Sequence, residues 1–461
     1  MGTRKQSQAP TFWVPHSALP LAASHPFYTR LNALLAGDGF DAFVDGQCAR
    51  FYAPGVGRPS LAPGVYFRLL LIGYFEGIDS ERGIAWRAAD SLALRDFLGV
   101  AWGEAVPDHS TLSRTRRLID LETHRAVFTW VLQLLGPAGL VQGQTLGVDA
   151  TTLEANAALR SIVRRDTGAS YETFLTGLAQ ASGIATPTRA DLVRVDRQRP
   201  KKGSNQDWQH PHDPDAQITK MKDGRTHLAH KVEHAVDLTT GALVAVTLHP
   251  AAQGDTTTLA ATLVEATEQL CAVAALTEAI ATGTELVADK GYHSRAVVLA
   301  VQQLGLRSYI AEPNRGRQQW VDQAAAYQAV AANRRRGHGA RGKRLPRRRG
   351  EFLERPFAHL DETGGMRRVH LRGHGNILKR LLVHASGFNL GLWMRHQVGV
   401  GTPRGLQGRG RPHVAIVVAA VTALLITLRH GWPRGRAQRR HPTTRLTNPW
   451  QITNLTFTTG C

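Results

Sequence analysis

The sequence has few cysteines and no signal-like apolar start, and each absence excludes classes of protein. Its three cysteines, Cys48, Cys271 and Cys461, stand far apart and form no CxxC pair. We therefore expect neither a zinc site nor a disulfide framework, and we expect a reducing compartment. Residues 1–10 are polar and basic and lead into no apolar segment, so no secretory signal is predicted.

Long hydrophobic runs are also scarce. The segment 414–428 is nearly all apolar and is flanked by Arg411 and Arg429. It has about fifteen residues, whereas a membrane-spanning helix needs roughly 20. A buried helix is therefore predicted, with no membrane partner. Residues 432–461 are rich in Arg, Pro and Thr, which predicts a loose tail.

Negative charge is in short supply. The chain has 36 Asp and Glu against 56 Lys and Arg, which gives a formal charge of +20. A surplus of this size indicates a phosphate-rich partner such as nucleic acid. A GC-rich genome would explain the preference for Arg over Lys, but not the excess of positive charge. The length of 461 residues and the 43% hydrophobic content predict two or three domains with ample cores.

The first 140 residues are predicted to be helical. Residues 66–75 are almost continuously apolar, as in a core helix, and 80–97 carry apolar residues at helical spacing with Ser80 as a possible cap. Residues 107–117 open a further helix that presents hydroxyls, Arg114, Arg116 and Arg117. Two successive helices of this kind fit a helix-turn-helix-like DNA module, and an ordinary helical bundle remains the alternative.

The pattern changes after residue 145. It reads as a strand at 146–149, a polar helix-prone insert at 150–219 with a loop at 198–215, a β-hairpin from 227–237 and 243–249, a helix at 257–275, a strand at 285–289, a helix at 294–304, a strand at 307–311 and a last helix carrying Glu354. This order predicts an α/β fold with a mixed sheet flanked by helices.

Three carboxylates stand out in this part. Asp149 and Asp289 each end a short apolar, strand-like run, and Glu354 follows an arginine-rich stretch. Hard divalent cations such as magnesium prefer oxygen ligands and need few protein carboxylates when phosphates supply the rest. Two such ions, roughly 3.5–4 Å apart, can clamp the attacking and leaving oxygens of a phosphoryl transfer.

The arginine-rich stretch itself is predicted to contact DNA. Residues 334–349 contain eight Arg, one Lys and no acid, which indicates a loop that is disordered or ordered by DNA. A purely solubilising run is the alternative. Because it lies just before Glu354, Arg347, Arg348 and Arg349 are predicted phosphate contacts.

Structural roles are expected for the other acids and for the histidines of this part. The acids Asp213 and Asp215 lie in a Pro-rich loop and Asp237 ends a hairpin strand, so turn or capping roles are expected. His227, His230, His234 and His249 have no further ligand at metal spacing.

Several short motifs make the chain resemble bacterial insertion-sequence transposases of the DDE class. The motifs are GVDATT at 147–152, MKDG at 221–224, ADKGY at 288–292, LERPF at 353–357 and FNL at 388–390, with PDHST at 107–111 in the helical part. The resemblance spans about residues 20 to 395, and it rests on the order and spacing of the motifs. It implies a catalytic domain with a ribonuclease-H-like fold.

The resemblance also implies a reaction. Asp149, Asp289 and Glu354 would bind two Mg²⁺ ions, or Mn²⁺, and catalyse hydrolysis at element ends and strand transfer into target DNA. The implied partners are double-stranded DNA, with terminal inverted repeats and a target, and a second copy of the chain as a homodimer on DNA. The implied location is the bacterial cytoplasm at the nucleoid, and Lys290 and Arg355 join the expected phosphate contacts.

The expected organisation has three parts: a helical DNA-binding domain at 1–140, a catalytic domain at 141–400 with insertions at about 150–219 and 314–350, and a helix with a basic tail at 401–461. The chain departs from the family pattern at Asp361, where a Lys is usual. Because Arg347 lies four residues before Glu351, Glu351 stays the alternative third acid. A nuclease that cuts without joining and a non-catalytic DNA-binding relic stay open as alternative functions.

Overall fold

A computed structural model describes residues 25–53, 60–101, 103–199, 203–273, 283–314, 316 and 319–407. The predicted apolar helix at 414–428 and the predicted tail lie outside these ranges. Within them, no helix combines the length and apolar character needed to cross a membrane.

The N-terminal part is helical, as predicted. Its helices are α1 (Pro26–Gly37), α2 (Phe40–Cys48), α3 (Pro63–Glu76), α4 (Glu81–Asp90), α5 (Leu92–Leu98), α6 (His109–Leu118) and α7 (Leu121–Leu135). Helix α3 is buried along almost its whole length. The single helix predicted at 80–97 is wrong, because Ser91 takes an extended backbone and caps α5, while Ser80 caps α4.

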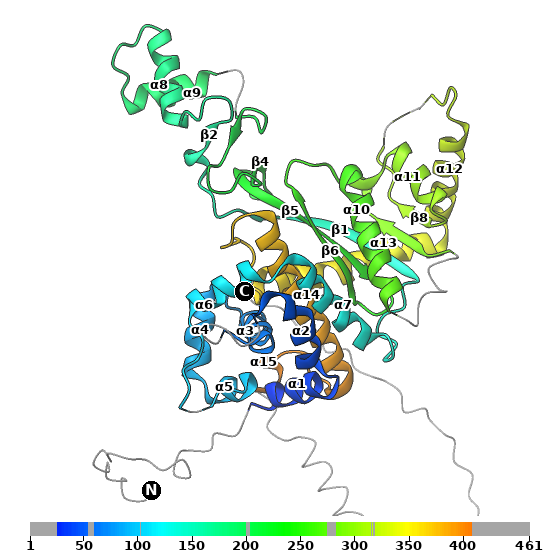
Figure 1. The fold of residues 1–461 in the computed structure, drawn as a ribbon. Helices are drawn as coiled ribbons and strands as arrows, with labels where there is room; N and C mark the ends of the chain where they lie inside the picture. Colours follow the sequence, from blue (N-terminus) through cyan, green and yellow to red (C-terminus); the bar gives the residue numbers. More distant parts are fainter. Residues whose placement is uncertain are drawn as a thin grey trace, which may run out of the picture. The chain divides into compact units, whose positions relative to one another are not determined.

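Six strands form the central sheet (Figure 1). They are β1 (Thr145–Glu154), β4 (Gln217–Lys220), β5 (Thr226–Asp237), β6 (Leu243–Pro250), β7 (Glu285–Ala288) and β8 (Arg307–Ile310). Strand β5 runs antiparallel to β1, β4 and β6, whereas β7 is parallel to β1 and β8 is parallel to β7. The predicted hairpin is the β5–β6 pair, and β1 lies at the centre of the sheet.

Helices flank this sheet. They are α10 (Asp255–Ala272), α11 (Arg295–Gln303), α12 (Ala324–His338), α13 (Ala340–Ala358), α14 (His374–Val398) and the short α15 (Arg404–Gln407). Helix α10 packs against β6 and β5, α13 against β1 and β7, and α14 against β6, α3 and α7. The predicted mixed sheet flanked by helices, with a helical N-terminal region, is confirmed.

One continuous core joins the helical region to the sheet. Asn389 of α14 contributes a polar link within it: its amide donates to the carbonyl of Leu243 and accepts from the amide of the same residue, at 2.8 and 2.9 Å. Both residues are buried, so these bonds fix the start of β6 to α14.

The basic stretch 334–349 is not a loop, and that prediction was wrong. It forms the end of α12 and the first half of α13, and Leu345 within it is buried. Arg334 pairs with Glu312 and Arg341 with Glu285. Arginine is a good helix former, and the acids that offset its charge come from β7 and from the loop after β8, which the local sequence does not reveal.

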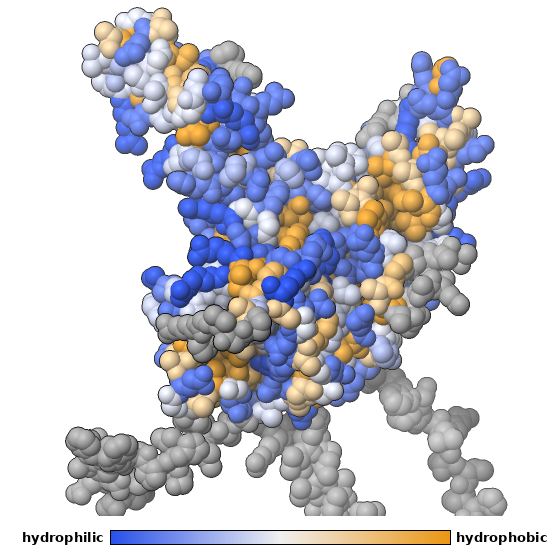
Figure 2. Space-filling view, in the orientation of Figure 1, coloured by the Kyte–Doolittle hydropathy of each residue, from blue (hydrophilic) through white to orange (hydrophobic). Residues whose placement is uncertain are grey.

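The insert after β1 folds on a small core of its own. It contains β2 (Val163–Arg164), α8 (Tyr171–Ala181), α9 (Arg189–Gln198) and β3 (Trp208–Gln209), and apart from β3 the segment predicted as loop has little regular structure. The face of the molecule drawn in Figure 2 is mostly hydrophilic, with hydrophobic side chains in separate patches, one of them over α11 and α12.

Candidate active site

Asp149 lies in the middle of β1 and not at its end. The predicted end at this residue was wrong, because β5 continues the ladder from the Leu146–Asp237 pair to the Glu154–Ala229 pair. What changes at Asp149 is burial: β1 is buried up to Val148 and half-buried from Asp149 to Thr152, after which Leu153 is buried again. The apolar half of β1 thus anchors the strand, and Asp149 is the first side chain that reaches toward solvent.

Asp289 directly follows β7, the neighbour of β1. The parallel register pairs Thr145 with Glu285 and Gly147 with Val287, so that two further residues bring Asp149 level with Asp289. The Asp289 carboxylate accepts a hydrogen bond of 2.8 Å from the amide of Gly291, which fixes the short helix η4 (Lys290–Tyr292). The structure therefore brings these two predicted acids together.

Arg349 lies next to the carboxylate of Asp149. Its guanidinium Nη1 lies 2.7 Å from Oδ2 of Asp149, and it projects from α13, the helix that carries Glu354. Burial raises the pKa of Asp149, the guanidinium opposes that rise, and the Asp289 carboxylate adds to it. Together these effects leave the pKa of Asp149 above its usual value.

Glu354 is placed differently. It is exposed on α13 between the buried residues Leu353 and Pro356, and no hydrogen bond or ion pair of its side chain occurs among the described residues. Residues five apart on a helix point about 140° apart, so Glu354 does not share the direction of Arg349. No group of three or more His, Cys, Asp and Glu side chains arranged to hold a metal occurs in the part of the chain described.

The alternative acid, Glu351, is also exposed. Its carboxylate pairs with Arg355 one helical turn later. Glu351 is therefore engaged within its own helix, and the structure brings neither it nor Glu354 to the two aspartates.

The predicted phosphate contacts divide into two groups. Most of them are exposed, namely Arg114, Arg117, Lys290, Arg347, Arg348 and Arg355. Arg116 is buried and pairs with Glu81 at 2.7 Å, so it joins α6 to α4. Arg349 is half-buried on Asp149.

Comparison with protein families adds a second line of evidence. Residues 20–118 match a family model described as "Transposase domain (DUF772)", and residues 204–387 match one described as "Transposase DDE domain". The chain belongs to the DDE-class insertion-sequence transposases. Comparisons with curated proteins and with solved structures gave no match.

The matched regions of this transposase fit its fold. The first covers α1 to α6, and the second covers β4 to β8 with Asp289 and Glu354. Asp149 lies before the second match, and its strand enters the same sheet through pairing with β5 and β7. A DDE domain is ribonuclease-H-like, in agreement with the predicted fold class.

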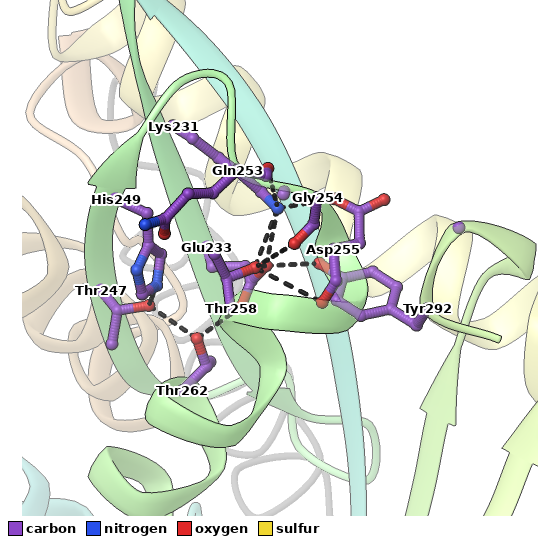
Figure 3. Close-up of polar contacts among 12 residues, drawn as sticks. Lys231, Glu233, Thr247, His249, Gln253, Gly254, Asp255, Thr258, Thr262 and Tyr292 are labelled. Carbon is purple, nitrogen blue, oxygen red and sulfur yellow. Dashed lines mark hydrogen bonds and ion pairs between the residues drawn. The ribbon is translucent and has the colours of Figure 1, made fainter. Parts of the chain in front are cut away.

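Sequence reasoning missed a polar cluster beside the two aspartates of the transposase (Figure 3). Glu233 of β5 is fully buried and accepts hydrogen bonds from Thr258 and Thr262 of α10 and from the Tyr292 hydroxyl of η4, the last at 3.0 Å. Lys231, two residues earlier on the same face of β5, reaches Asp255 at the start of α10 over 2.6 Å. One signal was present in the sequence: Lys231 and Glu233 are two residues apart in a predicted strand, so their side chains point to the same side.

Two histidines of β5, His230 and His234, lie in the interior, whereas His227 near the start of the strand is half-buried and pairs with Asp223. His230 lies 3.3 Å from Asp213, both of them buried, and His234 stacks on Phe357 of α13. Burial lowers the pKa of His234 to about 3, so its ring is neutral. Asp213, Asp215 and Asp237 accept hydrogen bonds from backbone amides, the last from Gln142, Gly143 and Thr239.

Proposed function

We propose that this transposase cleaves DNA at the ends of its element and joins the freed 3′ ends to target DNA. The observation that carries the proposal is the place of Asp149 and Asp289 on neighbouring parallel strands, where both carboxylates can face one phosphate. No protein nucleophile is needed for phosphoryl transfer between DNA strands, because positioning and charge supply most of the catalysis.

The donor set fits a divalent cation. Asp149 and Asp289 offer hard oxygen ligands, and such ions need only one or two carboxylates when phosphate oxygens complete the shell. When bound, Mg²⁺ or Mn²⁺ would activate the attacking oxygen and stabilise the leaving one. We propose two ions, with Asp149 and Asp289 as ligands and Glu354 as the third acid. Glu354 is exposed on α13, so its role as a ligand requires this helix to turn toward β1 and β7, the strands on which it packs.

DNA would lie along the exposed basic residues. Arg347 lies two helical turns before Glu354 on α13, Arg348 and Arg355 both lie over the ring of Phe352 on the same helix, and Lys290 adjoins Asp289. Arg114 and Arg117 would contact the terminal inverted repeats from α6. Such contacts make binding fall steeply with salt, because each neutralised phosphate releases counterions. Two element ends must be cut together, so we propose a homodimer on DNA, acting in the bacterial cytoplasm.

The test is a cleavage and strand-transfer assay with labelled DNA that carries the ends of the element, in Mg²⁺ or Mn²⁺. Asp149→Asn and Asp289→Asn should lose both cutting and joining while still binding DNA. The matched pair Glu354→Gln and Glu351→Gln decides the third acid, since both residues are exposed on α13 and only one should be needed.

Each outcome has a distinct meaning. Products that join in the wild type and vanish in the aspartate variants support the proposed transposition reaction. Cutting without joining supports a nuclease. Binding without either activity identifies a DNA-binding relic, and cutting by Asp149→Asn would show that the acid assignment is wrong.

A further inference from the structure

Asp255 is an acid beside the candidate site that neither the family motifs nor the sequence patterns singled out. It is the first residue of α10, and its carboxylate lies against Gly291 in η4. A Cβ on Gly291 would overlap Oδ2 of Asp255 and would lie 3.0 Å from Oδ1 of Asp289. The carboxylates of Asp255 and Asp289 therefore lie next to each other over the same glycine.

Lys231 holds this carboxylate by one oxygen. Its ammonium group lies 2.6 Å from Oδ1 of Asp255 and 2.9 Å from the Thr258 hydroxyl. The lysine is 4% exposed, whereas the Asp255 side chain is 35% exposed. Lys231 thus fixes Oδ1 from the protein interior, and Oδ2 points toward Gly291 and Asp289.

Glu233 ties the two acid-bearing segments to the sheet. The same carboxylate accepts from Thr258 of α10, three residues after Asp255, and from Tyr292 of η4, three residues after Asp289 (Figure 3). Because Glu233 is fully buried, these bonds are protected from water. The start of α10 and the turn after β7 are therefore both fixed to Glu233, and through it to each other.

The charges around this point do not balance. The acids are Asp149, Glu233, Asp255 and Asp289, and among the residues that the structure describes the cations in ion pairs with them are Lys231 and Arg349. The surplus is two negative charges in a partly buried place. Neighbouring like charges at short range are unfavourable unless a cation offsets them, and a divalent cation offsets this surplus.

We propose that Asp255 is a positioning residue of the DDE centre: with Oδ1 held by Lys231, its carboxylate orients Asp289 and adds the negative charge that draws a divalent cation to Asp149 and Asp289. This inference rests on the proposed function, since it gives that centre a fourth acid that acts through Asp289. It also accounts for Gly291, where any side chain would displace the Asp255 carboxylate.

The test is a Mn²⁺ titration of the full chain without DNA, followed by electron paramagnetic resonance of the free ion. Asp255→Asn is suited to it, because the amide oxygen can still accept from Lys231 while the charge is lost. Mn²⁺ binding should weaken about tenfold, as for other residues that orient metal ligands. Asp255→Glu keeps the charge and should restore most of the affinity.

Glu268→Gln is the matched control. Glu268 is exposed on the same helix, roughly 20 Å further along the axis at 1.5 Å per residue. Glu268→Gln therefore removes one negative charge from α10 far from the site and tests the effect of net charge alone. Its Mn²⁺ affinity should equal that of the wild type. If Asp255→Asn does not fold, as judged by circular dichroism, Asp255→Ser also removes the charge and tests the same loss of Mn²⁺ affinity.

The outcomes separate this inference from the proposed function. Asp149→Asn and Asp289→Asn serve as references that should lose Mn²⁺ binding. If they bind Mn²⁺ like the wild type, the metal centre itself is refuted. If they lose binding and Asp255→Asn does not, or if Glu268→Gln weakens binding equally, only the role of Asp255 is refuted.

Discussion

Arg349 and Asp149 form an ion pair of 2.7 Å that joins α13 to the central strand of the sheet. The same guanidinium also reaches the carbonyl of Val148 at 3.4 Å. A cation and a metal ion compete for the same carboxylate oxygen. Arg349, on the helix that carries Glu354, therefore holds a carboxylate oxygen that a metal ion at Asp149 would use.

Replacing Arg349 with glutamine should change metal binding in two ways. Burial raises the pKa of Asp149 and the guanidinium opposes this rise, so its loss should raise the pKa further. The carboxylate must be ionised to bind a cation, and binding is lost as the pH falls through that pKa. The pH midpoint of Mn²⁺ binding should thus move upward in the variant. Well above the midpoint, binding should be tighter, because the competing cation is gone.

Arg348→Gln is the control for this prediction. Arg348 is the exposed neighbour that donates to the carbonyl of Thr239 and does not contact Asp149. Mn²⁺ titrations across a pH series should give the wild-type midpoint for this variant. An unmoved midpoint in Arg349→Gln would show that the ion pair does not control Asp149.

Gly291→Ala should damage the site more than the fold. The added Cβ overlaps a carboxylate oxygen of Asp255, and the tip of a side chain can turn away at little cost in stability. Asp255 would then leave Asp289, and Mn²⁺ binding and DNA cleavage should fall together. The midpoint of thermal unfolding should fall by only about 1 °C, because a loss of about 1 kcal/mol shifts the midpoint of a chain of this size by about that much.

Gly177→Ala provides the comparison. Gly177 lies within α8, and apart from its chain neighbours and the backbone of its own helix no atom lies within 4 Å of the position of its missing Cβ. Alanine in a helix interior is favoured over glycine by about 0.5–1 kcal/mol, so this variant should be slightly more stable and fully active. If Gly291→Ala behaves the same way, the close approach of Asp255 has no functional meaning.

Local patterns in the sequence were enough to predict some elements. The residues that predict the end of β7 at Asp289 are neighbours in the sequence. An apolar run stops at a residue that can cap the turn after it, and the structure agrees. The cap by Ser80 and the β5–β6 hairpin are local in the same sense. Such features depend on neighbours within a few residues, which the sequence displays directly.

Other features depend on partners far along the chain. Strand β1 continues past Asp149 because β5, some eighty residues later, supplies its ladder. Two cations of the basic stretch, Arg334 and Arg341, pair with Glu312 and Glu285, which lie outside the stretch. Asp255 meets Gly291 only through the packing of α10 on the sheet. Nothing in the local sequence reports such contacts, and for this reason the buried cluster was missed.

Glu233→Gln should cost a large part of the stability of the catalytic part. Glu233 is fully buried and is the shared acceptor of Thr258, Thr262 and Tyr292, with Lys231 3.3 Å away. An amide has one acceptor oxygen in place of two, and Lys231 would keep only the half-buried Asp255 as a counter-charge. Breaking a buried ion pair from one side typically costs about 3–5 kcal/mol. Urea unfolding should show this as a lower midpoint at an unchanged slope.

The reason for this cost can be tested with a second variant. If the loss comes from an uncompensated Lys231, then removing both charges in Lys231→Met with Glu233→Leu should recover much of the stability, because well-packed apolar residues can replace a buried ion pair at little cost. The exposed Glu268→Gln should stay within about 0.5 kcal/mol of the wild type. A double variant as unstable as Glu233→Gln would mean that the hydrogen bonds to Thr258, Thr262 and Tyr292, and not the charge of Lys231, make Glu233 necessary. In that case α10 and the turn after β7 are held to the sheet mainly by hydroxyl groups.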